Sequence, residues 1–118
     1  MNARLNFKGK IVEIKDIIKA EGIKKFTGLM FSKGKHALLF DFSNPSKRAI
    51  HSLFCPNFLA IWLNDGKIVD YKLVNRREML IKPRTEFNKL LEIPANEKYM
   101  DIVGIFSHER KDLNTSSS

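Results

Sequence analysis

The segment His51–Val74, HSLFCPNFLAIWLNDGKIVDYKLV, contains the strongest structural signal in the chain. Large apolar side chains fill Phe58–Leu63, and an Asp-Gly pair follows directly. Such a run ending in Asp-Gly is typical of a strand that enters a tight hairpin turn, because both residues readily adopt the positive φ angles of that turn. The sequence therefore predicts a strand over Phe58–Leu63, a turn over Asn64–Gly66 and a second strand over Lys67–Val74.

The returning strand also predicts which of its faces is buried. Successive side chains of a strand point to opposite faces of the sheet. From Ile68 onward, one face of this strand is then fully apolar and is expected to point into the core, whereas the other carries Asp70 and Lys72. The apolar face consists of Val69, Tyr71 and Leu73, and the opposite face of Ile68, Asp70, Lys72 and Val74.

Outside this hairpin, short apolar runs alternate with turn signals such as the Asn-Pro pair within Ser43–Arg48. Ile11, Ile14 and Ile18 have helical spacing, but the β-branched residues of their run favour a strand. The further strands that we expect are Lys10–Ala20, His36–Phe42, Ala49–Phe54 and Lys89–Ala95, and the expected helices are Glu21–Phe31 and Asn96–Phe106, the latter capped by Asn96.

These elements predict an α+β, mostly β fold. We expect a single compact domain over residues 1–106, with a curled antiparallel, barrel-like sheet and two short helices. Residues 107–118 have little apolar content and are predicted to form a disordered polar tail. A length of 118 residues suits one domain with one core.

Composition indicates a cytoplasmic protein that does not enter a membrane. No apolar run approaches the roughly 20 residues of a membrane-spanning helix. The basic start, MNARLNFKGK, lacks the apolar stretch of a secretory signal. The single cysteine, Cys55, has no partner for an internal disulfide, which suits a reducing compartment.

The net charge of +8 is unevenly distributed. Residues 1–50 carry 11 Lys and Arg against 4 Asp and Glu, and residues 67–84 carry 6 against 2. Basic surfaces attract phosphate polymers. A nucleic-acid contact through the basic N-terminal half is therefore one hypothesis, although the sequence contains no RNA-binding aromatic motif, zinc-finger spacing or glycine-rich loop.

Four segments, in this order, form a recognisable set. They are GLMF (Gly28–Phe31), LLFDF (Leu38–Phe42), IHSLFCPNFLAIWLNDGKIVD (Ile50–Asp70) and LIKPRTEFNKLLEIPA (Leu80–Ala95). The set resembles an uncharacterised family of small prokaryotic proteins, domain of unknown function 192, over roughly residues 11–105. The resemblance implies a compact, mostly β fold and no particular activity. It identifies a divergent member, because Ala60 stands near a frequent acidic position of the family and Asn96 replaces its usual glycine.

Three residues of the opening segment are able to do chemistry. His51 matches the family's histidine and could relay protons, but a histidine on a half-buried strand is commonly structural. Cys55 lies between Phe54 and Pro56, where a cysteine usually behaves as a small hydrophobe. Trp62 is expected to share a face with Phe54 and Phe58, which is either core packing or an aromatic platform.

The best functional lead is the basic connection over Asn75–Asn88. Arginines on a loop suit phosphate or carboxylate ligands. A pocket between this connection and the turn at Gly28–Phe31 would combine a basic rim with an apolar floor. The predicted ligand-binding residues are Gly28, Met30, His51, Arg76, Arg77 and Arg84.

The sequence contains no Ser-His-Asp order, Walker loop or dinucleotide fingerprint, and its three histidines lack metal-ligand spacing. We therefore predict no catalytic residue, no metal and no cofactor. The leading hypothesis is a non-catalytic binding module for an anionic ligand or a protein partner. The alternatives are a nucleic-acid-binding module and an enzyme that uses His51.

Overall fold

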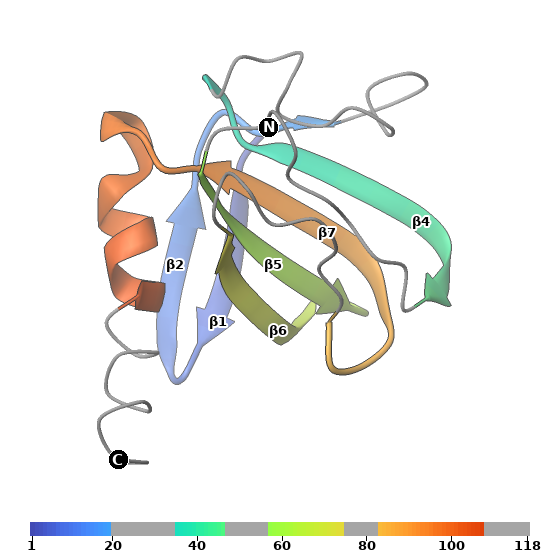
Figure 1. Ribbon diagram of the computed structural model, residues 1–118. Helices are drawn as coiled ribbons and strands as arrows, with labels where there is room; N and C mark the ends of the chain where they lie inside the picture. The colour runs from blue at the N-terminus through green and yellow to red at the C-terminus, as the bar shows by residue number, and fades with distance from the viewer. Residues whose placement is uncertain (20–34, 47–56, 75–82, 108–118) are drawn as a thin grey trace.

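The computed structural model describes residues 1–19, 35–46, 57–74 and 83–107. Within these ranges, seven strands in two sheets are followed by a short helix (Figure 1). The strands are β1 (Ala3–Phe7), β2 (Lys10–Ile14), β3 (Ile18–Lys19), β4 (Leu38–Ser46), β5 (Phe58–Asn64), β6 (Lys67–Val74) and β7 (Phe87–Pro94). The predicted mostly β domain is thus confirmed in outline.

The predicted hairpin of β5 and β6 is confirmed, and its turn has the expected backbone. Asp65 and Gly66 have φ angles of 52° and 81°. Two successive positive φ angles match the right-handed twist of the two flanking strands. Asp and Gly adopt such angles readily, which is why the pair predicted this turn. The two strands pair antiparallel from Phe58 opposite Val74 to Asn64 opposite Lys67.

The predicted core face of β6 is wrong, because an irregularity interrupts the pairing. Trp62 lies opposite Asp70 and Leu63 lies opposite Ile68, so Val69 is an extra residue on β6. An extra residue reverses the side-chain alternation across it. As a result Val69 and Tyr71 pack against different hydrophobic clusters. Leu73 is exposed, whereas Asp70 and Val74, on the opposite face from Leu73, are buried.

Strand β5 lies inside the five-stranded sheet, whose order is β3-β4-β7-β5-β6. It pairs antiparallel with β6 on one side and β7 on the other. Every residue of Phe58–Leu63 is buried, including the fully buried Trp62. A strand covered on both faces requires a continuous apolar run. The run Phe58–Leu63 meets this requirement and lies inside the sheet.

Alternate residues of β5 contribute to two hydrophobic clusters, one on each face of the sheet. Leu59, Ile61 and Leu63 pack with β7, with the β1–β2 hairpin and with the C-terminal helix. Phe58, Ala60 and Trp62 belong to the second cluster. We call the face that carries the second cluster the Trp62 face; its other members are Leu38, Phe40, Val74, Phe87 and Leu90.

The N-terminal region differs from the prediction. Strand β1 was not expected, and the strand predicted over Lys10–Ala20 is divided into β2 and the two-residue β3. Asp16, with a φ of 55°, marks the division. Lys8 and Gly9, with φ angles of 51° and 84°, form the turn between β1 and β2. This turn resembles the Asp65–Gly66 turn, but a lysine is a weak signal for it.

The helix predicted over Asn96–Phe106 is confirmed as a 3-10 turn, Glu97–Tyr99, that continues as an α-helix over 100–107. Asn96 is the N-cap, and its Oδ1 accepts a hydrogen bond from the Tyr99 backbone N at 3.3 Å. Tyr99 and Val103 face inward, whereas Met100 is exposed. Phe106 stacks on Phe7 and so joins the helix to the β1–β2 hairpin. The helix lies beside this hairpin in Figure 1.

Two expectations about the architecture change. The described strands form two open sheets, not one barrel-like sheet, and β3 pairs parallel with β4. The described residues contain one helix; the other predicted helix, Glu21–Phe31, and the predicted strand Ala49–Phe54 lie outside them. Strand β4 also continues to Ser46 through the predicted turn, with a register shift between Asp41 and Ser46.

Within the described residues, no helix combines the length and the apolar character that crossing a membrane would require.

Candidate functional site

Of the predicted ligand-binding residues, the structure describes Arg84, which forms an ion pair with the buried carboxylate of Asp70. The Arg84 Nη2 donates to Asp70 Oδ1 at 3.0 Å, and the Arg84 backbone N donates to Asp70 Oδ2 at 2.9 Å. The Arg84 side chain nevertheless remains 81% exposed, against 8% for Asp70. One end of this ion pair therefore belongs to the interior of the protein and the other to its surface.

Asp70 reaches this position because of the irregularity in β6. It lies opposite Trp62 and therefore on the Trp62 face, among apolar side chains. A buried carboxylate is costly unless donors surround it. Asp70 accepts a third hydrogen bond from the Tyr71 backbone N at 2.9 Å, so two backbone donors and one guanidinium donor stabilise its charge.

The same contacts act on Arg84. The hydrogen bond to Asp70, followed by the charge of its carboxylate, raises the pKa of the Arg84 guanidinium above its ordinary value. The guanidinium is therefore a permanent cation held at a fixed place on the surface. A guanidinium has five N–H donors, and with one Nη on Asp70 and most of the side chain exposed, the remaining donors are accessible to an anion from solvent.

The other predicted site residues lie outside the described part of the chain. They are Gly28, Met30, His51, Arg76 and Arg77. The same holds for Cys55 and Lys82. The expected pocket between the basic connection and the Gly28–Phe31 turn is consequently described at Arg84 alone.

Trp62 is described, and it is a core residue. It is fully buried, shares the predicted face with Phe58, and meets Phe87 edge-on with ring centroids 6.5 Å apart. The core reading of these two aromatic side chains is therefore confirmed, and they do not form an open platform.

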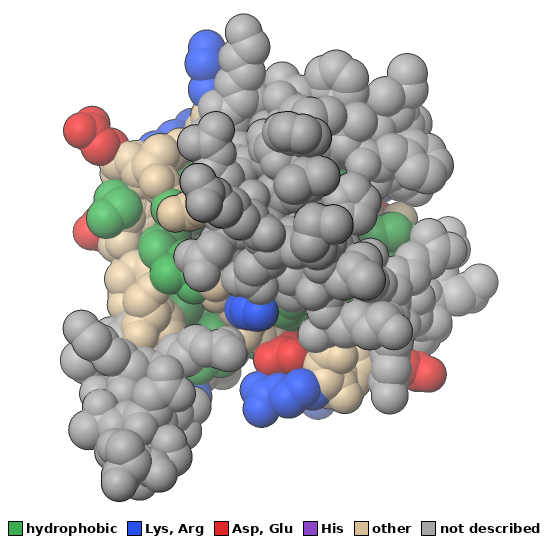
Figure 2. All heavy atoms as spheres, viewed as in Figure 1, with side chains coloured by type: hydrophobic (Ala, Val, Ile, Leu, Met, Phe, Trp, Pro, Cys, Tyr) green, Lys and Arg blue, Asp and Glu red, His purple; other side chains and the backbone are tan. Residues whose placement is uncertain are grey.

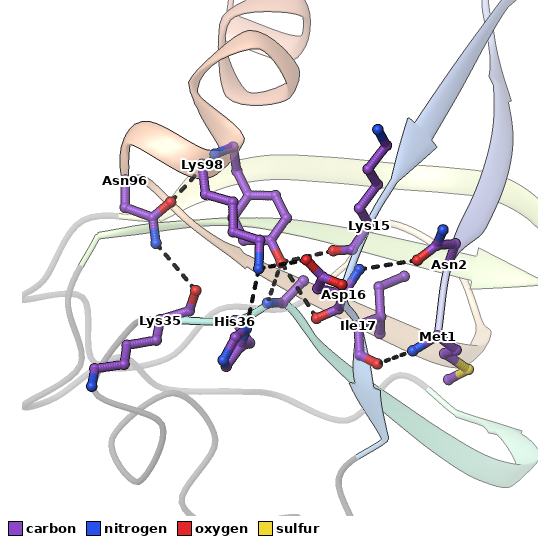
Figure 3. A network of polar contacts seen from close by, with 11 residues as sticks. Met1, Asn2, Lys15, Asp16, Ile17, Lys35, His36, Asn96 and Lys98 are labelled. Atoms are coloured by element: carbon purple, nitrogen blue, oxygen red, sulfur yellow. Dashed lines mark hydrogen bonds and ion pairs between the residues drawn. The ribbon is translucent and has the colours of Figure 1, made fainter.

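Sequence reasoning missed a second polar cluster, which surrounds the hydroxyl of Tyr99; Figure 3 labels its members Lys15, Asp16, His36 and Lys98. This hydroxyl donates to the Lys15 backbone O at 2.8 Å and accepts from the Ala37 backbone N at 3.1 Å. Tyr99 is only 1% exposed. One buried phenol thus connects the start of the helix to the segment after β2 and to the segment before β4.

Charged groups lie around this phenol. Lys98 Nζ pairs with Asp16 Oδ2 at 2.8 Å and lies 3.3 Å from His36 Nδ1 (Figure 3). The hydrogen bond with Lys98, and then its positive charge, lower the pKa of Asp16, and the hydrogen bond with Asp16 raises the pKa of Lys98. The side chains of Lys98 and Asp16 are 37% and 63% exposed, so solvent screens this ion pair and its contribution to the stability of the fold is small.

We call this second cluster the Tyr99 network. Asn96 Nδ2 donates to the Lys35 backbone O at 3.5 Å, and the Met1 ammonium donates to the Ile17 backbone O at 2.8 Å. The network brings positive groups from distant segments together, but it contains no nucleophile next to a base. Its hydrogen bonds join residues as many as 84 positions apart in the sequence. No local sequence motif could therefore predict the network.

No group of three or more His, Cys, Asp and Glu side chains is arranged to hold a metal ion in the described ranges.

Comparisons with known proteins bear on the fold. No family model matches the chain, and no curated protein matches it. The resemblance to domain of unknown function 192 therefore stays a prediction.

Two solved structures are similar. One, titled "putative transcription regulator" and from Sinorhizobium meliloti 1021, superposes with a TM-score of 0.66 at 18% identity over 86% of this chain and 83% of its own. The other, a protein of unknown function from Novosphingobium aromaticivorans DSM 12444, has a TM-score of 0.63 at 15% identity over 77% and 70%. At these identities the likeness shows the fold alone.

Proposed function

We propose that the chain is a non-catalytic binding module for a small anionic ligand, and that Arg84 is its principal recognition residue. The observation that supports this function is the asymmetry of the Asp70–Arg84 pair. Asp70 is buried and held by backbone donors, so it fixes the base of the guanidinium, while 81% of the Arg84 side chain is exposed.

Fixing the guanidinium favours binding for an entropic reason. A free arginine side chain loses rotamer freedom when it binds a ligand, whereas an anchored one has already lost part of it. The remaining donors are arranged in a planar fork that suits a carboxylate or a phosphate. The surrounding sequence, net basic over residues 67–84, would add a favourable field.

The second candidate is nucleic-acid binding through the basic N-terminal half, and it has its own support. Arg4, Lys8 and Lys10 are exposed along the β1–β2 hairpin, and Lys15 and Lys35 lie at the Tyr99 network. On the face shown in Figure 2, however, the described Lys and Arg side chains are separated, and one group adjoins acidic side chains. On this face, the separation of the described cations favours a small ligand over an extended polyanion.

The test is a calorimetric titration with two probe anions, citrate and inorganic pyrophosphate, on wild type, Arg84→Gln and Arg4→Gln. Arg4 is a matched control, because its side chain is 76% exposed and also pairs with a carboxylate, that of Glu13 at 3.5 Å. We expect Arg84→Gln to abolish binding of the preferred anion and Arg4→Gln to leave it unchanged. Equal binding by Arg84→Gln and wild type would refute the proposal.

A labelled DNA duplex and a labelled RNA strand test the second candidate in the same variants. Nucleic-acid binding should weaken steeply as salt rises, since counterions are released on binding, and Arg4→Gln should then reduce affinity as much as Arg84→Gln does. An affinity that is insensitive to salt would eliminate this candidate.

A further inference from the structure

The ion pair at Arg84 carries no net charge, and this restricts the anions that it can hold. The guanidinium contributes one positive charge, and the carboxylate of Asp70, 3.0 Å away, contributes one negative charge. Within the described ranges, no second lysine or arginine is bonded to Asp70. An anion that binds Arg84 therefore meets an attractive charge and a repulsive charge side by side.

Asp70 also occupies donors that a highly charged ligand would need. Sites for phosphate commonly gather several backbone N–H groups around the anion. Here the backbone N of Arg84 and the backbone N of Tyr71 both donate to Asp70, each at 2.9 Å. The part of the site that the structure describes consequently offers a ligand the guanidinium of Arg84 and no backbone donor from these two residues.

The guanidinium keeps one complete pair of donors. Nη2 uses an N–H on Asp70 Oδ1. The two N–H groups of Nη2 belong to different edges of the guanidinium, so the edge that does not face Asp70 retains both of its donors. Two parallel N–H···O bonds from such an edge match the two oxygens of one carboxylate.

A second charge on the ligand gains little at this edge. With hydrogen bonds of about 3 Å, the bound anion lies roughly 6 Å from the Asp70 carboxylate. At that distance the repulsion by Asp70 offsets much of the additional attraction by Arg84. The hydration that a bound ion partly gives up, by contrast, grows with the square of its charge. The balance therefore favours an anion with a single charge.

We propose that the Arg84 site selects singly charged carboxylates, and that Asp70 is the residue that sets this selectivity. The inference rests on the proposed anion-binding function and adds the chemical class of the ligand. Glu86, exposed two residues after Arg84, adds another negative charge to this stretch of the chain. Of the two probes named above, citrate, whose carboxylates are separate, should bind more tightly than pyrophosphate.

The test is a calorimetric titration with three ligands that share a benzene ring, at about pH 8. Benzoate and benzenesulfonate carry one charge, whereas phenyl phosphate carries two, because its second pKa is about 6. Benzenesulfonate has the tetrahedral shape of the phosphate and so separates shape from charge. Salt at about 0.15 M screens the charges farther away than about 8 Å, which leaves mainly the effect of Asp70.

In wild type we expect benzoate to bind at least about threefold more tightly than phenyl phosphate, with benzenesulfonate also above phenyl phosphate. Asp70→Asn removes the negative charge and keeps one acceptor oxygen. It should raise the affinity for phenyl phosphate relative to benzoate by about threefold or more, since a change in the anchoring of Arg84 affects both ligands alike. Glu13→Gln removes the carboxylate of the matched Arg4–Glu13 pair and should leave this ratio unchanged.

Equal or tighter binding of phenyl phosphate by wild type would overturn the selectivity, and so would an unchanged ratio in Asp70→Asn. If Asp70→Asn does not fold, the comparison of the three ligands on wild type decides alone. Arg84→Gln separates this inference from the proposed function. If wild type binds all three ligands equally and Arg84→Gln binds none, only the selectivity is wrong. If Arg84→Gln binds them as wild type does, or wild type binds none, the proposed function fails with it.

Discussion

Replacing Asp70 with alanine removes the charge that holds the chain around Arg84 to the sheet. Asp70 is 8% exposed and accepts from the backbone N of Tyr71, the backbone N of Arg84 and the Arg84 Nη2, all at 2.9 to 3.0 Å. In Asp70→Ala the two backbone donors lose their acceptor in a half-buried position, and the Arg84 guanidinium loses its anchor.

The cost follows from these three contacts. A backbone donor left unpaired in the interior costs about 1–3 kcal/mol. The contact with the largely exposed guanidinium adds about 0.5 kcal/mol, because solvent screens it. Water will reach part of the site, so we expect a total loss of about 2–4 kcal/mol in the free energy of unfolding. For a domain of this size the melting temperature should fall by roughly 10 °C.

The assay is urea unfolding, followed by Trp62 fluorescence and circular dichroism. Asp70→Asn keeps one acceptor oxygen and should lower the free energy of unfolding by about half as much as Asp70→Ala does. Arg84→Gln keeps the carboxylate and both backbone donors, so it should lower the free energy of unfolding by about 0.5–1 kcal/mol. Asp101→Ala removes an exposed carboxylate from the helix and serves as the control. If Asp70→Ala unfolded at the same urea concentration as Asp101→Ala, our account of the buried carboxylate would be wrong.

Three further predictions concern the Tyr99 network and the Trp62 face. Tyr99→Phe leaves the Ala37 backbone N–H without its acceptor and should lower the free energy of unfolding in urea by about 1–3 kcal/mol; a loss near zero would contradict the role of the hydroxyl. Lys98→Met should raise the pKa of the Asp16 carboxyl toward its ordinary value in an NMR titration, and an unchanged pKa would refute the pairing. Because the lowered pKa contributes stability above the ordinary carboxyl value that is lost as pH falls toward the lowered one, acid unfolding of Lys98→Met should also depend less on pH in that window. Asn64 Oδ1, on the same strand as Trp62, is buried and has no hydrogen-bond partner in the described part of the chain. Asn64→Leu replaces this acceptor with an apolar group of similar shape and should be neutral or stabilising in urea unfolding, whereas a loss above about 1 kcal/mol would show that the Asn64 oxygen is satisfied within the fold.

Local signals in the sequence predicted the features that depend on neighbouring residues. The Asp65–Gly66 turn, the apolar strand before it and the Asn96 cap each depend on a few adjacent side chains. The turn at Lys8–Gly9 has the same backbone but was missed, because a lysine rarely adopts a positive φ and its presence there depends on the pairing of β1 with β2.

Features that depend on distant residues could not be predicted. The irregularity at Val69 reverses the alternation of β6, and nothing in the residues Lys67–Val74 marks where it falls. Asp70 is buried because Arg84, fourteen residues later, satisfies it. The basic segment over residues 67–84 contains two acidic residues, Asp70 and Glu78, and the sequence alone does not show which of them pairs with an arginine.

The same limit applies to the candidate site. The sequence drew attention to Arg84 as an arginine in a connection, but its anchoring by the buried carboxylate of Asp70 depends on the sheet. The Tyr99 network unites Lys15, His36 and Lys98, which are far apart in sequence and belong to no common motif. The unpaired oxygen of Asn64 is likewise visible only when the packing around it is known.

The central claim is that an anchored, exposed guanidinium at Arg84 recognises an anion. The most direct measurement follows the side-chain Nε–H signals of the arginines by NMR while citrate or pyrophosphate is added. We predict that the Arg84 signal moves saturably and that the Arg4 signal moves little. Equal movement of both signals, or a still Arg84 signal while the protein binds the anion, would contradict the account.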